Sequence, residues 1–238
     1  MKKRLQTIIS QAGVTSRRNA AKMIEEGKVT VDGEVVREKG HRVDAAECEI
    51  LVEGKPLPEG DKEKYTFLFH KPKDVISTAY DPQERRKVTD FFKGINARLY
   101  PIGRLDKDTT GIILVSNDGE LTHKLAHPKS EVEKVYLVKV SNEITDESLE
   151  RIENGINLDG KKLAPCEIQV VSKGPRFSVL TVHLHEGKKR QIKRIFGTFG
   201  HRVLELKRIG YAGLSLGDLK EGEYRELTKE EIEILRNL

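Results

Sequence analysis

The longest uninterrupted aliphatic run in this chain has four residues, Ile112 to Val115, and a polar loop leads directly into it. Four apolar residues suit a buried strand, whereas a membrane-spanning helix needs about 20. The loop, Tyr100 to Gly111, contains Arg104, Asp106 and Asp108. If the loop is extended, Arg104 and Asp106 point to the same side. Charged side chains at the edge of a buried strand are typical of functional sites, so this loop is the candidate site.

From the residues alone, several interpretations of this loop stay open. Asp106, Asp108 and Gly111 match positions one, three and six of a calcium-binding loop, but Asn117 stands at position twelve, where that loop needs a glutamate. A metal-dependent hydrolase using the two aspartates would lose activity with a chelator. A structural polar turn is the simplest alternative. A zinc site would need three histidines to converge, which their spacing does not show: His183, His185 and His201.

The composition indicates a compact intracellular protein. A chain of 238 residues with 37% hydrophobic content is expected to form one or two domains with a real core. The basic start, Met1 to Arg4, is not followed by a continuous apolar stretch, so we expect no signal peptide and a cytoplasmic location. Cys48 and Cys166 lie far apart without a CxxC pattern, which favours reduced thiols. The glycine-rich motifs of nucleotide-binding proteins are absent.

The N-terminal segment predicts a basic helical module. Residues 1–42 hold ten Lys or Arg against five Asp or Glu, which suits a phosphate polymer as partner, although a solvated surface has the same charge count. A second helix is predicted from the N-cap Ser16 to Gly27, with Arg17 and Arg18 in its first turn. Cations there oppose the helix dipole, which is better explained if phosphate binds. The first helix, residues 3–12, is predicted from helical spacing of apolar residues: Leu5, Ile8, Ile9 and Ala12.

A hairpin follows the two helices, with strands at residues 29–31 and 35–36 around the turn Asp32-Gly33. Together with residues 12–18 and 27–29, it resembles the S-four-like RNA-binding domain, and a generic helical cap on a larger domain is the alternative. We therefore expect an RNA-binding domain over residues 1–60, a linker at about 56–64 and a larger domain over 65–238.

The larger domain is predicted to be an α+β domain with a mixed, mainly antiparallel sheet. Helical stretches alternate with strand-like runs, without the regular alternation of a parallel βαβ fold. The strand-like runs are 65–69, 111–115, 134–140, 168–171 and 178–185. Leu204 and Leu206 lie on a later apolar strand.

Four segments of this domain resemble, in order, the motifs of the rRNA pseudouridine synthases of the RsuA, RluB, RluE and RluF types. These segments are 69–77, 103–121, 134–138 and 185–196. Several residues look closest to the RluB type: Phe91, Tyr100 to Ile102, Asn117 to Leu121, and His127-Pro128. Lys107-Asp108 and Glu133-Lys134 also resemble the RluF type. The resemblance implies isomerisation of a uridine in RNA, in which a glycosidic C–N bond breaks and a C–C bond forms, with no cofactor and no metal.

The resemblance also implies roles for single residues. Asp106 matches the catalytic aspartate, acting as nucleophile at C1′ or as base at C2′. Arg104 matches a residue that helps displace the base, and an ion pair with Asp108 is its alternative role. Tyr136 would pack against the flipped uracil, and Lys193 would pair with Asp106. Leu206 matches a residue of the uracil pocket, although a plain core role is an alternative.

We expect an isomerase that modifies one uridine, with large-subunit 23S rRNA favoured. The same chemistry on small-subunit 16S rRNA, or a noncatalytic rRNA-binding or assembly factor, are the alternatives. We further expect a monomer that binds rRNA, as a folded stem-loop or within a ribosomal subunit assembly intermediate, and that binds no membrane. The cations expected to contact RNA are Arg17, Arg18, Lys28, Lys188, Lys189, Arg190 and Arg194.

Overall fold

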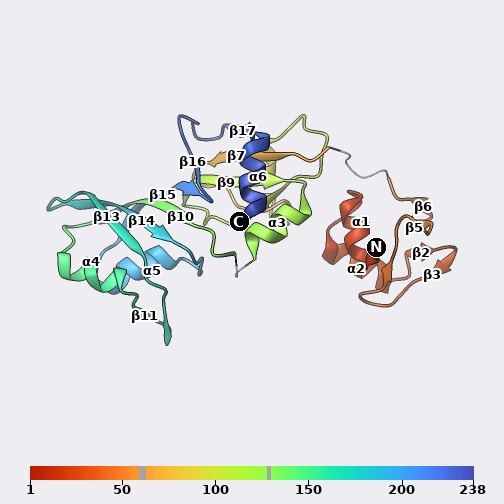
Figure 1. The fold of residues 1–238 in the computed structure, drawn as a ribbon, viewed down its shortest axis with the longest axis horizontal. Helices are drawn as coiled ribbons and strands as arrows, with labels where there is room; N and C mark the ends of the chain where they lie inside the picture. The colour runs from red at the N-terminus through yellow and green to blue at the C-terminus, as the bar shows by residue number, and fades with distance from the viewer. Residues whose placement is uncertain (59–62, 128–129) are drawn as a thin grey trace. The chain divides into compact units, whose positions relative to one another are not determined.

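The computed structural model describes residues 1–58, 63–127 and 130–238, and the chain divides into two compact units. The first comprises Met1–Lys64 with Asn96–Arg98, and the second comprises Tyr65–Ile95 with Leu99–Leu238 (Figure 1). Part of the expected linker, residues 59–62, lies outside the described residues, as does Pro128.

In the first unit, two helices pack on small antiparallel sheets. The side chain of Ser16 accepts a hydrogen bond from the Asn19 backbone N–H, as its predicted N-cap role requires. Asp32 and Gly33 have φ of 51° and 83°, the left-handed pair that a tight hairpin turn demands. The elements are β1 (Lys3–Arg4), α1 (Leu5–Gln11), α2 (Arg17–Glu25), β2 (Val29–Val31), β3 (Glu34–Val35), β4 (Arg42–Val43), β5 (Ile50–Val52) and β6 (Lys55–Pro56).

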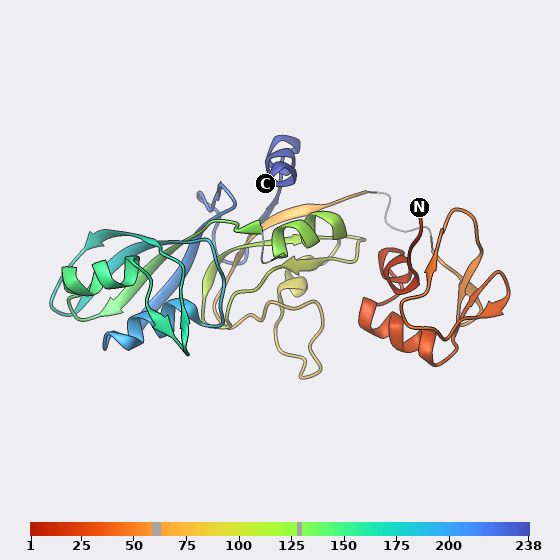
Figure 2. The same ribbon diagram turned by 60° about the horizontal axis from the view of Figure 1, so that its bottom comes forward.

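The second unit is built on one sheet with the strand order β13-β14-β10-β15-β9-β7-β17 (Figures 1 and 2). Its neighbours pair antiparallel except β15 and β9, which are parallel. The strands are β7 (Thr66–Lys71), β9 (Thr110–Ser116), β10 (Lys134–Ser141), β13 (Glu167–Ser172), β14 (Phe177–Leu184), β15 (Val203–Tyr211) and β17 (Tyr224–Glu226). The prediction of an α+β fold with a mixed, mainly antiparallel sheet is therefore confirmed.

Two hydrophobic clusters anchor the helices of this unit to the sheet. One joins α3 and α6 to β7 and β9, and the other joins α4 and α5 to β10 and β14. The remaining elements are β8 (Tyr100–Ile102), η1 (Val88–Phe91), α3 (Gly119–Ala126), α4 (Asp146–Glu153), β11 (Asn157–Leu158), β12 (Lys161–Lys162), α5 (Gln191–Thr198), β16 (Leu214–Ser215) and α6 (Lys229–Asn237).

The predicted strands coincide with β7, β9, β10, β13 and β14, and the aliphatic run Ile112 to Val115 is completely buried in β9. The prediction of an apolar strand around residue 204 needs a correction. Leu206 is buried, but Leu204 is 45% exposed. In a regular strand the two side chains would share one face, but the register shifts at Leu204: Lys139 pairs with Glu205 and Val140 with Val203, so Leu204 lies in a β-bulge. Within the described ranges, no helix is long and apolar enough to cross a membrane.

Candidate active site

The candidate loop enters a tight turn at Asp106, between β8 and β9. The Thr109 N–H donates to the Asp106 carbonyl at 3.1 Å, while Leu105 and Thr109 are buried on either side. The Ser77 hydroxyl contacts both backbone groups of Leu105, accepting from its N–H at 3.0 Å and donating to its carbonyl at 2.9 Å. The Asp106 side chain remains 38% exposed on this fixed backbone. The turn thus presents a carboxylate to solvent, while hydrogen bonds hold the backbone on both sides of it.

A fully buried lysine lies beneath the turn. Lys71, at the end of β7, donates from Nζ to the carbonyls of Pro72 and Val75 at 2.8 Å, and to that of Lys107 at 3.4 Å. The Lys107 carbonyl also accepts from the Asp74 N–H. Burial lowers the pKa of Lys71 to about 8. Sequence reasoning missed this role, although a lysine at the end of a strand whose other residues are mostly apolar was an available signal.

Lys193, from α5, reaches both aspartates of the turn. Its Nζ lies 3.7 Å from Oδ2 of Asp106 and hydrogen-bonds Oδ1 of Asp108 more closely. Burial raises the pKa of Asp108, but the hydrogen bond and charge of Lys193 outweigh it, so the pKa lies below its usual range. The expected ion pair of Lys193 with Asp106 is present, but Lys193 is shared. A lysine contacts these carboxylates through one ammonium, whereas an arginine could donate two parallel hydrogen bonds to a single carboxylate.

The other predicted residues of the site come from the loop and the middle of the sheet. Arg104 is exposed, and within the described ranges no ion pair joins it to Asp108 or another acid. Tyr136, on β10, is half-buried and pairs with Arg208 on β15. Leu206 lies two residues earlier on β15 and packs in the same cluster that Tyr136 borders. Since Lys207 pairs with Thr110, the strand with Leu206 adjoins the strand that follows the loop.

The residues proposed for a metal are engaged otherwise. An ammonium already sits between Asp106 and Asp108, which disfavours a cation there. Among the residues described, no three potential ligands cluster for a metal ion. The three histidines each have a partner of their own: His183 with Glu133, His185 with the Glu131 carbonyl, and His201 with the Ser141 carbonyl.

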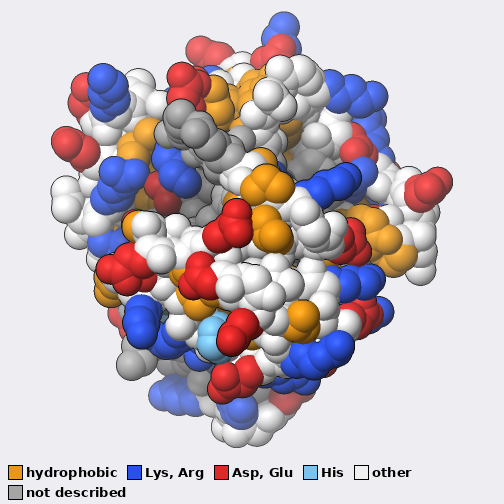
Figure 3. Space-filling view, turned by 90° about the vertical axis from the view of Figure 1, so that its right-hand side faces the viewer, with side chains coloured by type: hydrophobic (Ala, Val, Ile, Leu, Met, Phe, Trp, Pro, Cys, Tyr) orange, Lys and Arg blue, Asp and Glu red, His pale blue; other side chains and the backbone are white. Residues whose placement is uncertain are grey.

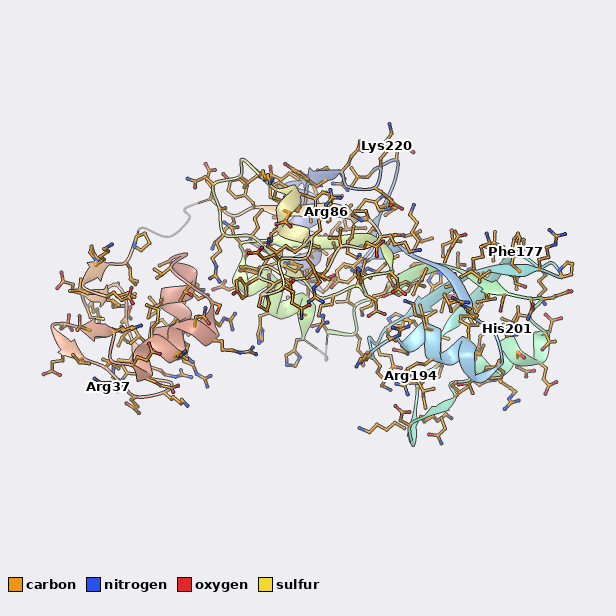
Figure 4. The ribbon with its side chains drawn as sticks, turned by 180° about the vertical axis from the view of Figure 1, so that it is seen from behind. Arg37, Arg86, Phe177, Arg194, His201 and Lys220 are labelled. Carbon is orange, nitrogen blue, oxygen red and sulfur yellow. The ribbon has the colours of Figure 1, made fainter. Side chains whose placement is uncertain are left out.

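The cations expected to contact RNA fall into two groups. Arg194 extends from α5 (Figure 4) to pair with Asp159, while Lys188 pairs with Glu186 at 2.9 Å and Lys28 with Glu26 at 2.9 Å. The second group is exposed and forms no ion pair within the described residues: Arg17, Arg18, Lys189 and Arg190. The charge of Arg190 nevertheless contributes to the lowered pKa of Asp108. Figure 3 shows one face of the molecule, on which Lys and Arg are interspersed with Asp and Glu.

Comparison with known proteins places this chain in one family. Residues 65–197 match the family model of RNA pseudouridylate synthase, and residues 3–47 match the S4 domain. The chain is 46% identical to ribosomal large subunit pseudouridine synthase B of Bacillus subtilis, over 99% of this chain and 96% of that protein. It is 37% identical to an uncharacterized RNA pseudouridine synthase of Aquifex aeolicus, over 98% and 93% of the two chains.

A solved structure agrees with these sequence matches. A crystal structure of a pseudouridylate synthase superposes with a TM-score of 0.71 at 31% identity, covering 98% of this chain and 99% of the other. The two-unit fold, with a carboxylate turn beside a central sheet, is thus that of an RNA-modifying isomerase. The protein belongs to the RNA pseudouridylate synthase family.

Proposed function

We propose that this protein isomerises one specific uridine of large-subunit rRNA to pseudouridine. The observation that carries the proposal is the half-exposed carboxylate of Asp106, held on a rigid turn 3.7 Å from the ammonium of Lys193. The relative from Bacillus subtilis, named as a large-subunit synthase, is 46% identical over 99% of this chain and supports the choice of large-subunit rRNA.

The reaction requires the uridine to leave its stack, at a cost on the order of a few kcal/mol. Arg104 is exposed beside Asp106, so its planar guanidinium is free to fill the space that the base vacates. The uracil then packs against Tyr136, with Leu206 lining the pocket. Both side chains are already held by the sheet, so little ordering is needed when the base arrives.

Asp106 acts at the ribose, either as nucleophile at C1′ or as base at C2′. In both routes Asp106 acts as a carboxylate, and Lys193 places its ammonium 3.7 Å from Oδ2. After the C–N bond breaks, the uracil turns and C5 bonds to C1′, which releases Asp106 from C1′ in the nucleophilic route or returns the proton to C2′ in the base route. C5 then loses its proton and N1 ends with one, so no atom is gained or lost. The Tyr136 hydroxyl is suited to proton transfer during this re-addition. No redox step occurs, so the chemistry calls for no cofactor.

The N-terminal unit is proposed to hold the folded rRNA. Residues 1–42 carry a net charge of +5, but residues 43–64 carry −4, so the attraction is local to the helices. Arg17 and Arg18, exposed in the first turn of α2, are the proposed phosphate contacts. On this proposal the enzyme works as a monomer in the cytoplasm, where rRNA is found.

The test is to map pseudouridine across the rRNA of cells that lack this protein. The map is repeated after restoring the wild type, Asp106→Asn, or Asp146→Asn as a matched change at an exposed aspartate of α4. We expect one large-subunit site to vanish and to return with the wild type and Asp146→Asn alone. If the site that vanishes lies in small-subunit rRNA, that rRNA is the substrate instead. If Asp106→Asn restores the site as well as the wild type does, the catalytic assignment is wrong and a noncatalytic rRNA-binding factor becomes the better interpretation.

A further inference from the structure

The sheet of the second unit has one weak seam. β10 pairs with β14 through eight residue pairs and β7 with β9 through six, whereas β15 pairs with β9 only through Lys207↔Thr110 and Arg208↔Gly111. This seam joins the strands on the Tyr136 side of the sheet to the strands on the Asp106 side. Within the sheet, the strand pairing that joins the Asp106 side to the Tyr136 side therefore consists of two residue pairs.

The backbones at this seam approach unusually closely. Gly111 has φ of 105°, and a Cβ added to it would lie 2.1 Å from the Arg208 carbonyl oxygen. No side chain fits in that space, so glycine is required at this position. Gly111 is also the residue at which the candidate loop ends and β9 becomes buried.

The side chain of Arg208 reinforces the seam just beyond its last pair. Arg208 is 3% exposed, and its Nε donates to the Ile112 carbonyl at 2.7 Å. Its guanidinium carbon lies 4.7 Å from the ring centre of Tyr211, which adds a cation–π contact. On its other side, the backbone of Arg208 pairs with Tyr136. One residue thus connects the start of β9 with the strand that carries the tyrosine.

This arginine is costly to bury. Among the residues described, no carboxylate forms an ion pair with it, and its Nη2 is buried without a hydrogen-bond partner. Burial and the nearby charge of Arg208 together lower the pKa of Lys134 to about 8, so the guanidinium also disfavours a neighbouring cation. An apolar side chain of similar length would avoid these penalties. Its bond to Ile112 is the contact that an apolar residue could not replace.

We propose that Arg208 is a positioning residue, which holds β9 against β15 and thereby sets the placement of Asp106 relative to Tyr136. The inference rests on the proposed function, because the two residues that it aligns are those assigned to the reaction. Loss of the bond to Ile112 would let the seam open. A displacement of about 1 Å between groups that act on one substrate can lower the rate by roughly 100-fold.

The test compares Arg208→Met, which keeps an unbranched apolar stem but removes the donor, with Arg208→Lys, which retains one donor that can reach the Ile112 carbonyl. Steady-state kcat and KM are measured on an rRNA transcript that the wild type modifies, and backbone hydrogen exchange is followed at residues 110–113 and 207–209. Leu235→Ala, a cavity variant in the buried face of α6, serves as the control for lost stability alone.

We expect Arg208→Met to lower kcat by roughly 10- to 100-fold with KM nearly unchanged, and to speed exchange at the seam but not at residues 67–69. Arg208→Lys should recover part of kcat, and Leu235→Ala should match the wild type once corrected for the folded fraction. Unchanged kcat and exchange in Arg208→Met, or a change in KM alone, would overturn the inference. A wild type that modifies no rRNA would overturn the proposed function instead, and exchange at the seam would then decide the inference.

Discussion

Lys193 Nζ lies 3.7 Å from Oδ2 of Asp106 while it hydrogen-bonds Asp108, so one ammonium serves two carboxylates from a helix far along the chain. The lysine side chain is only 14% exposed, whereas the two carboxylates are 38% and 49% exposed. The cation is therefore screened from water while its partners face the solvent. Electrostatic effects on Asp106 should depend on this shared contact.

Lys193→Met should lower the single-turnover rate constant by about 100- to 1,000-fold, because a preorganised charge beside the reacting carboxylate is removed. Lys193→Arg should stay within about tenfold of the wild type, since a guanidinium can contact both carboxylates. The measurement is pseudouridine formation in a single turnover. Asp108→Asn, which frees Lys193 for Asp106 alone, should retain activity, and its complete inactivation would assign the chemistry to both aspartates.

Ser77→Ala should destabilise the protein by roughly 1–2 kcal/mol, because the Leu105 N–H loses its acceptor in a partly buried site. At a temperature where the variant is folded, kcat should still be lower than that of the wild type, since the Asp106 turn then moves. Urea unfolding and kcat are measured together. Thr78→Ala is the matched control, because that hydroxyl bonds only to the exposed Tyr80 backbone. Equal losses of kcat in the two variants would refute the assignment.

The free energy of unfolding of the wild type should rise with pH more than that of the Lys71→Met variant. The pKa of Lys71 falls from its ordinary 10.5 to about 8 on folding, so below pH 8 the folded protein holds a buried charge at full cost. Between pH 8 and 10.5 the folded form releases this proton first, and stability increases by up to roughly 3 kcal/mol. Urea unfolding at pH 7.5, 9 and 10 measures the difference. If the free energies of unfolding of the two proteins changed equally with pH, the prediction would be contradicted.

Replacing both Arg17 and Arg18 by Gln should weaken RNA binding uniformly and flatten its salt dependence. Each lost phosphate contact reduces the slope of log K against log salt by about 0.7 to 0.9. Lys28→Gln is the matched control, because Lys28 already pairs with Glu26 and Glu53. Binding to the substrate rRNA fragment is titrated from low to moderate salt. If Lys28→Gln lost as much of the salt dependence, the absence of an ion pair would not distinguish the arginines that bind phosphate from other cations.

Much of the fold was predictable because local patterns are sufficient for it. Apolar spacing placed α1 and α2, the Ser16 side chain capped α2 as expected, and the Asp32-Gly33 turn closed the hairpin. The five predicted strands and the mixed sheet were also correct. These features follow from backbone preferences and from the burial of one face, which neighbouring residues reveal.

The candidate site was predictable as a set of residues but not as an arrangement. The pattern around Asp106 identified the loop, and the match to Lys193 predicted their contact, which is a property of the motifs. Sequence spacing could not show that Lys193 also contacts Asp108. Nor could it show that Ser77 and Lys71 hydrogen-bond the backbone of the turn. Those contacts join separate segments whose approach depends on how the strands pack.

The linear order of residues was thus enough to predict the first two helices, five strands of the large sheet, the family, and Asp106 as the candidate carboxylate. Only the tertiary structure decided that β15 and β9 meet through two residue pairs, where Gly111 admits no side chain and Arg208 bonds to Ile112. The physical reason is range. Local conformation depends on neighbouring residues, whereas a seam between strands depends on distances that are defined when the whole sheet closes.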